Sequence, residues 1–286
     1  MSQLNSVLSL IAMATELQTE IARAAEVLLE SRYVIALVGA GISVESGIPP
    51  FRGAGGLWTK HGEPPMDGYE RFLADPGTHW QAMLARRASD DEFSQALRAA
   101  RPNAAHLALA RLESIGLLQH TISQNIDDLH FQAGSTAVTE IHGNRTKVRC
   151  IECGARWLWE EFTVTEVPPS CPQCGGVVKG DVVMFGEPIP REFLVECQAQ
   201  AERADCVLIA GTSATVYPAA AFPEIVLNSG GALVEVNTDE TPFSRYASAI
   251  LRGPAGELLP RLVAEVEARG GDGKTARFDP DGSAVQ

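Results

Sequence analysis

The sequence predicts an α/β fold, a doubly wound parallel (Rossmann-like) sheet with a small inserted module. Short apolar runs rich in β-branched residues recur along the chain, and helical patterns at 103–115 and 190–204 lie between them. Strands that alternate with helices in this way are typical of parallel sheets covered on both faces. The runs that we expect to form strands span 33–38, 117–123, 206–211, 232–237 and 249–253.

The predicted strands end in small or polar residues. In doubly wound sheets, ligands bind in the crevice beyond the carboxyl ends of the strands. The residues at these ends therefore predict one shared crevice, and they are Gly39-Ala40-Gly41, Ser123-Gln124-Asn125, Gly211-Thr212-Ser213 and Asn237-Thr238.

The composition is that of an acidic globular protein. The chain has 286 residues and a formal net charge of −13, so we expect no direct nucleic-acid binding and favour small molecules or basic peptides as partners. No window approaches the length of a membrane span, and the N-terminus lacks the basic region of an export signal. We therefore expect a cytoplasmic protein with no membrane partner, which begins with an amphipathic helix over Leu8–Glu30.

An irregular stretch interrupts the alternation of strands and helices. Residues 144–180 hold two C-x-x-C pairs and a second half rich in proline and glycine, so we expect an inserted module there. We expect 54–80 to form a loop with short helices over the crevice, and the aperiodic tail to be disordered. The predicted units are an N-terminal helical segment at 1–30, an α/β domain at 31–143 and 181–268, the module at 144–180 and the tail at 269–286.

Four of the six cysteines have the spacing of a zinc site, and they are Cys150, Cys153, Cys171 and Cys174. Two C-x-x-C knuckles offer four thiolates, which complete the tetrahedral coordination of Zn²⁺ and leave no open position. Such a site would be structural, and the alternative, four unrelated thiols, is disfavoured by the spacing. Cys197 and Cys206 fall in a predicted helix and a predicted strand, where we expect them to be core residues.

The loop after the first strand keeps part of a phosphate-binding fingerprint. Gly39 and Gly41 would let the backbone approach a phosphate closely, and Ser43 adds a hydroxyl, but valine stands where the third glycine of G-x-G-x-x-G is expected. A glycine and two prolines then prevent a long helix, so the chain extends outward to Phe51 and Arg52. These two side chains suit covering a ribose and binding phosphate. The alternative is a tight turn followed by a buried phenylalanine and a surface arginine.

Polar groups also follow the second predicted strand. Gln124, Asn125 and Asp127 stand where a ligand of the crevice would be bound, although Asp127 or Asp128 could instead cap a helix. His142, in the sequence "EIHGN", could act as a general base near neutral pH, although a lone histidine is more often structural. The histidines without a comparable context are His61, His79, His106, His120 and His130.

Taken together, these segments resemble the sirtuin family of NAD-dependent protein lysine deacylases. The resemblance covers roughly residues 20–265, and its motifs follow in the family's order. They are "GAGISVESGIPPFRG", "QNIDDLH", "EIHG", the paired C-x-x-C, "VVMFGE", "GTSATVYPAA", "VNTDET" and "GPAGELLP".

The resemblance implies a reaction and a role for each matching residue. NAD would lie in the crevice, the acyl oxygen of an acyl-lysine would attack the ribose carbon, and nicotinamide would leave. His142 would be the general base that activates a ribose hydroxyl, with Asn125 and Asp127 beside it, and the products would be free lysine, nicotinamide and acylated ADP-ribose. The residues assigned to NAD are Gly39, Ala40, Gly41, Ser43, Phe51, Arg52, Trp58, Gln124, Asn125, Asp127, Gly211, Thr212, Ser213, Asn237 and Ala255.

The motifs that the resemblance assigns to the substrate are only partly present. "DVVMFGE" at 181–187 resembles the segment that pairs strand to strand with the acylated peptide. "FRGAGGLW" at 51–58 is most similar to the branch that removes succinyl and malonyl groups with a Tyr-x-x-Arg motif, and Met83 and Arg86 stand at those positions. Arg86 could pair with a carboxylate, but Met83 lacks the hydroxyl, so acetyl, succinyl, malonyl and longer groups all stay open. The residues assigned to the substrate are Met83, Arg86, Val182, Val183, Phe185 and Gly186.

Two other functions stay open. A mono-ADP-ribosyltransferase could use the same scaffold, although intact Asn125, Asp127 and His142 favour deacylation. A non-enzymatic zinc ribbon that binds nucleic acid is disfavoured because glutamates balance the positive charge around the cysteines. The residues compared are Lys147, Arg149, Arg156 and Lys179 against Glu152, Glu160 and Glu161.

Overall fold

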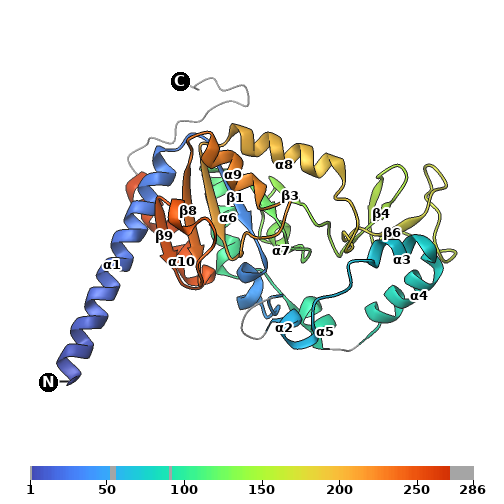
Figure 1. Ribbon diagram of the computed structural model, residues 1–286, viewed down its shortest axis with the longest axis horizontal. Coiled ribbons are helices and arrows are strands. Elements are labelled where there is room, and N and C mark those ends of the chain that lie inside the picture. The colour runs from blue at the N-terminus through green and yellow to red at the C-terminus, as the bar shows by residue number, and fades with distance from the viewer. Residues whose placement is uncertain (1, 52–55, 90–91, 271–286) are drawn as a thin grey trace.

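The structure, a computed structural model, describes residues 2–51, 56–89 and 92–270 (Figure 1). Its larger sheet is parallel throughout, with the strand order β3-β2-β1-β7-β8-β9. This sheet confirms the predicted fold class. Its strands are β1 (Val34–Val38), β2 (Leu118–Ser123), β3 (Val138–Glu140), β7 (Cys206–Ala210), β8 (Ala232–Asn237) and β9 (Ala249–Arg252).

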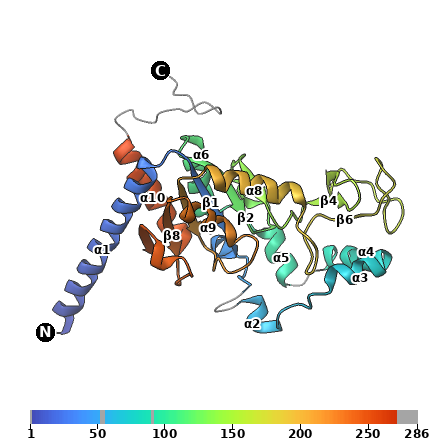
Figure 2. The same ribbon diagram turned by 45° about the horizontal axis from the view of Figure 1, so that its top comes forward.

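Helices cover both faces of this sheet (Figures 1 and 2). One face carries α1 (Ser2–Glu30), α6 (Ala104–Ser114) and α10 (Ala255–Gly270), and the other carries α8 (Arg191–Arg203) and α9 (Ala221–Asn228). The other helices of the described residues are η1 (Ala40–Ser46), α2 (Leu57–His61), α3 (Gly68–Ala74), α4 (Pro76–Arg87), α5 (Glu92–Ala99), α7 (Leu129–Gln132) and η2 (Ser244–Tyr246).

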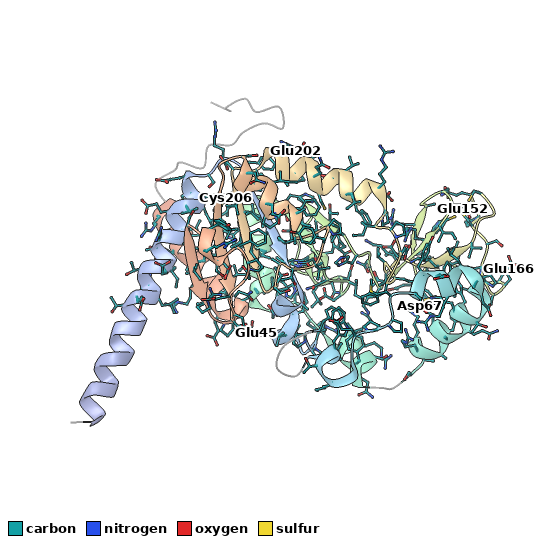
Figure 3. The ribbon with its side chains drawn as sticks, viewed as in Figure 1. Glu45, Asp67, Glu152, Glu166, Glu202 and Cys206 are labelled. Atoms are coloured by element: carbon teal, nitrogen blue, oxygen red, sulfur yellow. The ribbon has the colours of Figure 1, made fainter. Side chains whose placement is uncertain are left out.

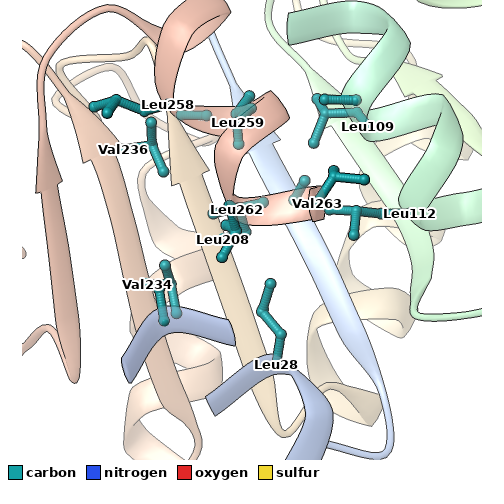
Figure 4. Packing of buried hydrophobic residues seen from close by; sticks show 14 of the residues in the cluster. Leu28, Leu109, Leu112, Leu208, Val234, Val236, Leu258, Leu259, Leu262 and Val263 are labelled. Carbon is teal, nitrogen blue, oxygen red and sulfur yellow. The ribbon is translucent and has the colours of Figure 1, made fainter. Parts of the chain in front are cut away.

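The core lies between the sheet and these helices because successive residues of a strand point to opposite faces. In β1, Val34, Ala36 and Val38 pack toward α1, α6 and α10, whereas Ile35 and Leu37 pack toward α8 and α9. Burial on both faces explains why these strands are continuous apolar runs in the sequence. Figure 4 shows the first of the two layers, in which Leu28, Leu109, Leu112, Leu259 and Leu262 surround Leu208, Val234 and Val236.

A second, smaller sheet stands at the far end of the molecule from α1. It is antiparallel, with the order β5-β4-β6, and its strands are β4 (Lys147–Cys150), β5 (Arg156–Leu158) and β6 (Val178–Gly180). Trp80 of α4 is fully buried against this sheet, where it stacks on Trp159 and its indole N–H donates to the carbonyl of Val178 at 2.6 Å. In Figure 3, Glu152 and Glu166 mark this end of the molecule.

Several predicted boundaries differ from those of the structure. The first helix begins at Ser2 instead of Leu8, and α10 continues to Gly270, two residues into the predicted tail. The rest of that tail lies outside the described residues. The predicted loop at 54–80 contains α2 and α3 and ends inside α4. Among the described helices, none is both long and apolar enough to cross a membrane.

Candidate functional site: a crevice at the strand ends

Two glycine loops, one after β1 and one after β7, meet where the strand order of the sheet reverses its direction. From β1 the strands proceed to β2 and β3 on one side, and β7, β8 and β9 extend on the other. At this point the amide of Gly41 donates to the carbonyl of Gly211 at 2.7 Å. A Cβ atom on Gly41 would lie 2.7 Å from that carbonyl oxygen, and one on Gly39 would lie 2.7 Å from Cβ of Thr212. The glycines are therefore needed for this close approach of two backbones, which forms the base of the predicted crevice.

The chain leaves the first loop in the way that the sequence predicts. The short 3₁₀ helix η1 ends at Ser46, and its C-cap residue Gly47 has φ of +85°. The segment beyond it brings the ring of Phe51 to 5.1 Å from that of Trp58, which in turn lies 5.8 Å from Phe185. This row of aromatic rings joins the cofactor loop to the predicted substrate segment. Arg52 lies outside the described residues.

Three predicted cofactor residues form one buried cluster. Ser43, Asn125 and Asp127 are 1%, 6% and 6% exposed. The Ser43 hydroxyl donates to Oδ2 of Asp127 at 2.7 Å and accepts from the Asn125 amide at 3.1 Å. Oδ1 of Asp127 accepts from the amide of Leu129, the first residue of α7. One carboxylate oxygen of Asp127 thus fixes the turn that enters α7, and the other holds Ser43. The N-cap residue of α7 is Asp128, which makes no side-chain capping hydrogen bond.

Two histidines that lacked context in the sequence adjoin this cluster. The amide of Asn103 donates to Nδ1 of His106, which places the His106 proton on Nε2, 3.4 Å from the Ser43 hydroxyl. The ring of His130 packs against that of His106, with centroids 4.9 Å apart. Sequence analysis missed both, although Asn103-x-x-His106 is a capping box and could have been recognised.

The remaining residues that the sequence assigns to the cofactor lie along the same edge of the sheet. The Gln124 amide donates to Thr212 Oγ1 at 2.8 Å, and the Asn237 amide donates to the Thr212 carbonyl at 2.8 Å. Ser213 is exposed, and Ala255 is buried at the start of α10. Glu45, labelled in Figure 3, accepts from the next amide of α10 and ties this helix to η1. Residues from four strand ends therefore converge as the sequence predicts, with Ala40 at the start of η1.

His142 is held in one orientation and one tautomer. Its Nδ1 lies 2.9 Å from the carbonyl oxygen of Gln124, and a carbonyl only accepts, so Nδ1 carries the proton. Burial lowers the pKa of His142 below its usual value, and the hydrogen bond to Gln124 opposes this only in part. The side chain is therefore neutral at pH 7 with a lone pair on Nε2. That is the state a general base requires.

A cavity of about 380 Å³ lies beside the predicted substrate segment. Its lining includes Met83 and Arg86 of α4, Ile126 and Val182. It also collects five of the 23 arginine and lysine side chains of this acidic protein, and they are Arg86, Arg87, Arg98, Arg145 and Lys147.

The rest of the predicted substrate segment lies beside this cavity. The amide of Val183 donates to the carbonyl of His142 at 2.9 Å, and Phe185 is 38% exposed. Gly186 has φ of +79°, and a Cβ there would lie 2.4 Å from the carbonyl oxygen of Met66. The structure thus places Val183 of the predicted substrate segment next to His142.

The four predicted zinc ligands come together at one end of the small sheet. Their Sγ atoms all lie within 4.8 Å of one another, with Cys150 and Cys174 at 3.5 Å and Cys153 and Cys171 at 3.7 Å. Tetrahedral Zn²⁺ with bonds of about 2.3 Å places its sulfur ligands about 3.8 Å apart, so these thiols fit zinc. Cys197 and Cys206 are buried in α8 and β7, as expected of core residues.

The buried histidine pair predicts acid sensitivity. Burial lowers the pKa of His106 to about 4 and that of His130 to about 3, whereas both titrate near 6.5 in an unfolded chain. As the pH falls from 7 to 5, the unfolded state binds protons that the folded state does not, so the free energy of unfolding decreases by up to about 2 kcal/mol per histidine. His130→Phe should flatten this dependence. Urea denaturation at pH 7, 6 and 5 measures it, and an unchanged slope would contradict the assignment.

Comparison with known proteins agrees with this geometry. A sequence model described as the Sir2 family matches residues 39–218. The NAD-dependent protein deacylase of Thermococcus kodakarensis is 44% identical over 250 residues, which cover 85% of this chain and 95% of that protein. The NAD-dependent protein deacylase of Pyrococcus abyssi is 45% identical over 251 residues, with 86% and 98% covered.

Solved structures give the same result. A Sir2 homologue in complex with ADP ribose has a TM-score of 0.74 and 40% identity, with 87% of this chain and 97% of that chain covered. A Sir2–p53 peptide–NAD⁺ complex has a TM-score of 0.67 and 35% identity, with 86% and 96% covered. Because the sequence match spans most of both lengths and the crevice contains the matching motifs, this chain belongs to the Sir2 family.

Proposed function

We propose that the protein is an NAD-dependent protein deacylase, which converts an acyl-lysine and NAD into free lysine, nicotinamide and O-acyl-ADP-ribose. The observation that carries the proposal is the neutral, oriented His142 beside a crevice of glycine loops and buried amides. Relatives that match this chain over nearly their whole length are named NAD-dependent protein deacylases. Related Sir2 structures hold NAD, ADP ribose or a peptide.

The crevice residues suit NAD, whose ribose carbon and nicotinamide leaving group supply the electrophilic chemistry. The backbones of Gly39–Gly41 and Gly211–Ser213 would hold the phosphates, since close backbone approach is what these glycines permit. The buried cluster of Ser43, Asn125 and Asp127 would bind the polar groups of nicotinamide and its ribose. The Phe51 and Trp58 rings would cover the opening.

His142 would act as the general base. The Gln124 carbonyl fixes Nδ1–H and thereby leaves Nε2 to take a proton from a ribose hydroxyl. Because burial lowers the pKa of His142, the base form persists below pH 6.5. Asn125 and Asp127 would orient the cofactor beside it.

The segment that follows the small sheet would bind the acylated peptide. Within the described residues, neither the Val183 carbonyl nor the Phe185 amide makes a backbone hydrogen bond, so both could pair with an extended peptide. The acyl chain would enter the adjoining cavity lined by Met83 and Arg86.

The four cysteines suit a structural Zn²⁺, which supplies no chemistry to the reaction. A site of four thiolates is maintained in a reducing compartment, which supports a cytoplasmic location. We expect no nucleic-acid partner, since Arg149 and Lys179 are buried in ion pairs and add nothing to a basic surface.

Turnover of acyl peptides tests the proposal. The protein with NAD should release free lysine from acetyl-, succinyl- or myristoyl-lysine peptides, followed by mass spectrometry. If no acyl peptide is turned over while NAD labels a protein, the activity is ADP-ribosyl transfer and the proposal is wrong.

The cavity predicts a role for Arg86 in acyl preference. If its guanidinium binds an acyl carboxylate, Arg86→Met should lower kcat/KM for a succinyl peptide by about 10- to 100-fold and leave that for an acetyl peptide nearly unchanged. Arg71→Met provides the control, because Arg71 lies on α3 in an exposed pair with Asp67. Equal losses on both peptides would remove Arg86 from this role.

A further inference from the structure

A buried lysine lies beneath the predicted substrate segment. Lys179 of β6 is 0% exposed, which is rare for a lysine. Its ammonium donates to the carbonyls of Gly180 and Val182, both at 2.8 Å, and lies 3.0 Å from Oε2 of Glu187. All three N–H groups therefore have a partner, and two of these partners belong to the segment that follows the strand.

Glu187 closes that segment into a turn. Its Oε2 accepts from the Met184 amide at 2.8 Å, and its Oε1 lies 2.5 Å from the Arg149 guanidinium. The Glu187 side chain is only 2% exposed. One buried cation thus holds the start of the segment through Val182 and its end through Glu187, and so sets the curvature of the backbone between them.

Other backbone groups of the same segment bond to neighbouring parts of the protein. The Val183 amide donates to the His142 carbonyl at 2.9 Å, and the Phe185 carbonyl accepts from the backbone amide of Tyr69 in α3 at 3.0 Å. A peptide that pairs with Val183 and Phe185 requires correct spacing of these backbone groups, and the spacing depends on the curvature.

Stability alone does not explain a buried ion pair here. Desolvation lowers the pKa of Lys179 to about 8 despite the opposing charge of Glu187, so burial disfavours its charged form. Buried ion pairs often contribute no more stability than well-packed apolar residues of similar size. An apolar side chain, however, has no N–H groups to donate to two backbone carbonyls and a carboxylate.

We propose that Lys179 is a positioning residue for the acylated peptide, acting through the Val182 carbonyl and Glu187 on the segment 181–187. This inference rests on the proposed deacylase function, because it assumes that the segment binds the peptide. Lys179 touches neither NAD residues nor His142 in the hydrogen bonds described, so its effect should be confined to the peptide.

Lys179→Met tests the proposal by separating KM from kcat. We expect the peptide KM and the peptide Kd to rise about tenfold or more, since two carbonyls and a carboxylate lose their shared partner. The KM for NAD and kcat at saturating peptide should stay within about twofold. Lys179→Arg, which keeps the charge and several donors, should recover most of the peptide affinity. Initial rates and fluorescence polarisation of a labelled acyl peptide measure these quantities.

Arg156→Met is the matched control. Arg156 belongs to the same small sheet and pairs with the side chain of Asp181, the first residue of the segment, at 2.9 Å, but it contacts no backbone group of 181–187. Without Arg156, the Asp181 carboxylate keeps its ion pair with Arg149 and its hydrogen bond from the Asn144 amide. It should lower thermal stability and leave the peptide KM near that of the wild type. If Lys179→Met does not fold, Lys179→Met with Glu187→Gln removes both charges together and keeps the test.

Three results would overturn the proposal in an active wild-type enzyme. The first is a folded Lys179→Met variant whose peptide Kd is unchanged. The second is a Lys179→Met variant in which the KM for NAD rises as much as the KM for the peptide. The third is an Arg156→Met control whose peptide KM rises as much as that of Lys179→Met. A wild-type protein that turns over no acyl peptide contradicts the deacylase function itself, which is a separate outcome.

Discussion

His142→Ala should lower deacylation by about 10²- to 10⁴-fold while NAD remains bound, because loss of a general base costs this much. The pH profile should agree: kcat/KM stays high at pH 6.5 and falls only as the pH decreases through the lowered pKa of His142, where protonation removes the lone pair on Nε2. Single-turnover mass spectrometry measures the reaction, and calorimetry measures NAD affinity.

Retained NAD binding follows from the hydrogen bonds of the site. His142 bonds to the backbone carbonyl of Gln124, whereas the Gln124 side chain is held separately by Thr212. Removal of the imidazole therefore leaves the crevice intact. His120→Gln is the control, because His120 lies within β2 and contacts Thr139 Oγ1 at 2.9 Å. Turnover in His142→Ala within about tenfold of the wild type would exclude the general-base role.

Removal of zinc should unfold the small sheet and abolish peptide turnover. The apolar core of this sheet is small: among the described residues, its fully buried side chains besides the cysteines are Trp80, Val148 and Val178. We therefore expect the thiolates to supply much of its stability. Structural zinc sites contribute about 10–16 kcal/mol in zinc-finger peptides, as much as the net stability of many domains. The segment 181–187 directly follows β6 and would lose its support, so peptide binding should fail with the sheet.

The four tryptophans make this loss measurable. Trp157 and Trp159 belong to the small sheet or its edge, and Trp80 packs against it, so most tryptophan fluorescence reports on this region. A chelator or Cys171→Ser should change the emission in step with zinc release, detected with a metallochromic dye. Cys197→Ser serves as the control and should retain the metal, because Cys197 lies in α8. A zinc-free protein that still deacylates peptides would contradict the prediction.

The parallel sheet could be predicted because the apolar residues that specify each strand are consecutive in the sequence. Strands buried on both faces must be continuous apolar runs, and β1, β7 and β8 lie within one residue of the predicted bounds. The cysteine cluster was equally predictable, since two knuckles of fixed spacing determine the ligand set. The polar residues at the strand ends could be located for the same reason, because the fold brings carboxyl ends together.

Other features depend on contacts between distant segments. The three-residue strand β3 is too short to show a period, and only pairing with β2 makes it a strand. Lys179 has the sequence appearance of a surface residue, and its burial depends on Glu187 and on carbonyls that only the folded turn assembles. The position of His130 beside His106 likewise follows from how α6 and α7 pack. Such features arise from tertiary structure, so no window of the sequence contains them.

The pairing of α1 with α10 has a practical consequence for handling the protein. Gln18 donates to Glu265 at 3.1 Å, and Gly270 lies beside Leu29, so the first and last helices run side by side at the end of the molecule away from the small sheet (Figure 1). A tether or fluorophore attached at the start of α1 would therefore stand clear of the segment 181–187, which we propose binds the peptide. Surface-immobilised protein oriented in this way presents its substrate side to the flowing solution, which suits kinetic measurements of peptide capture and release.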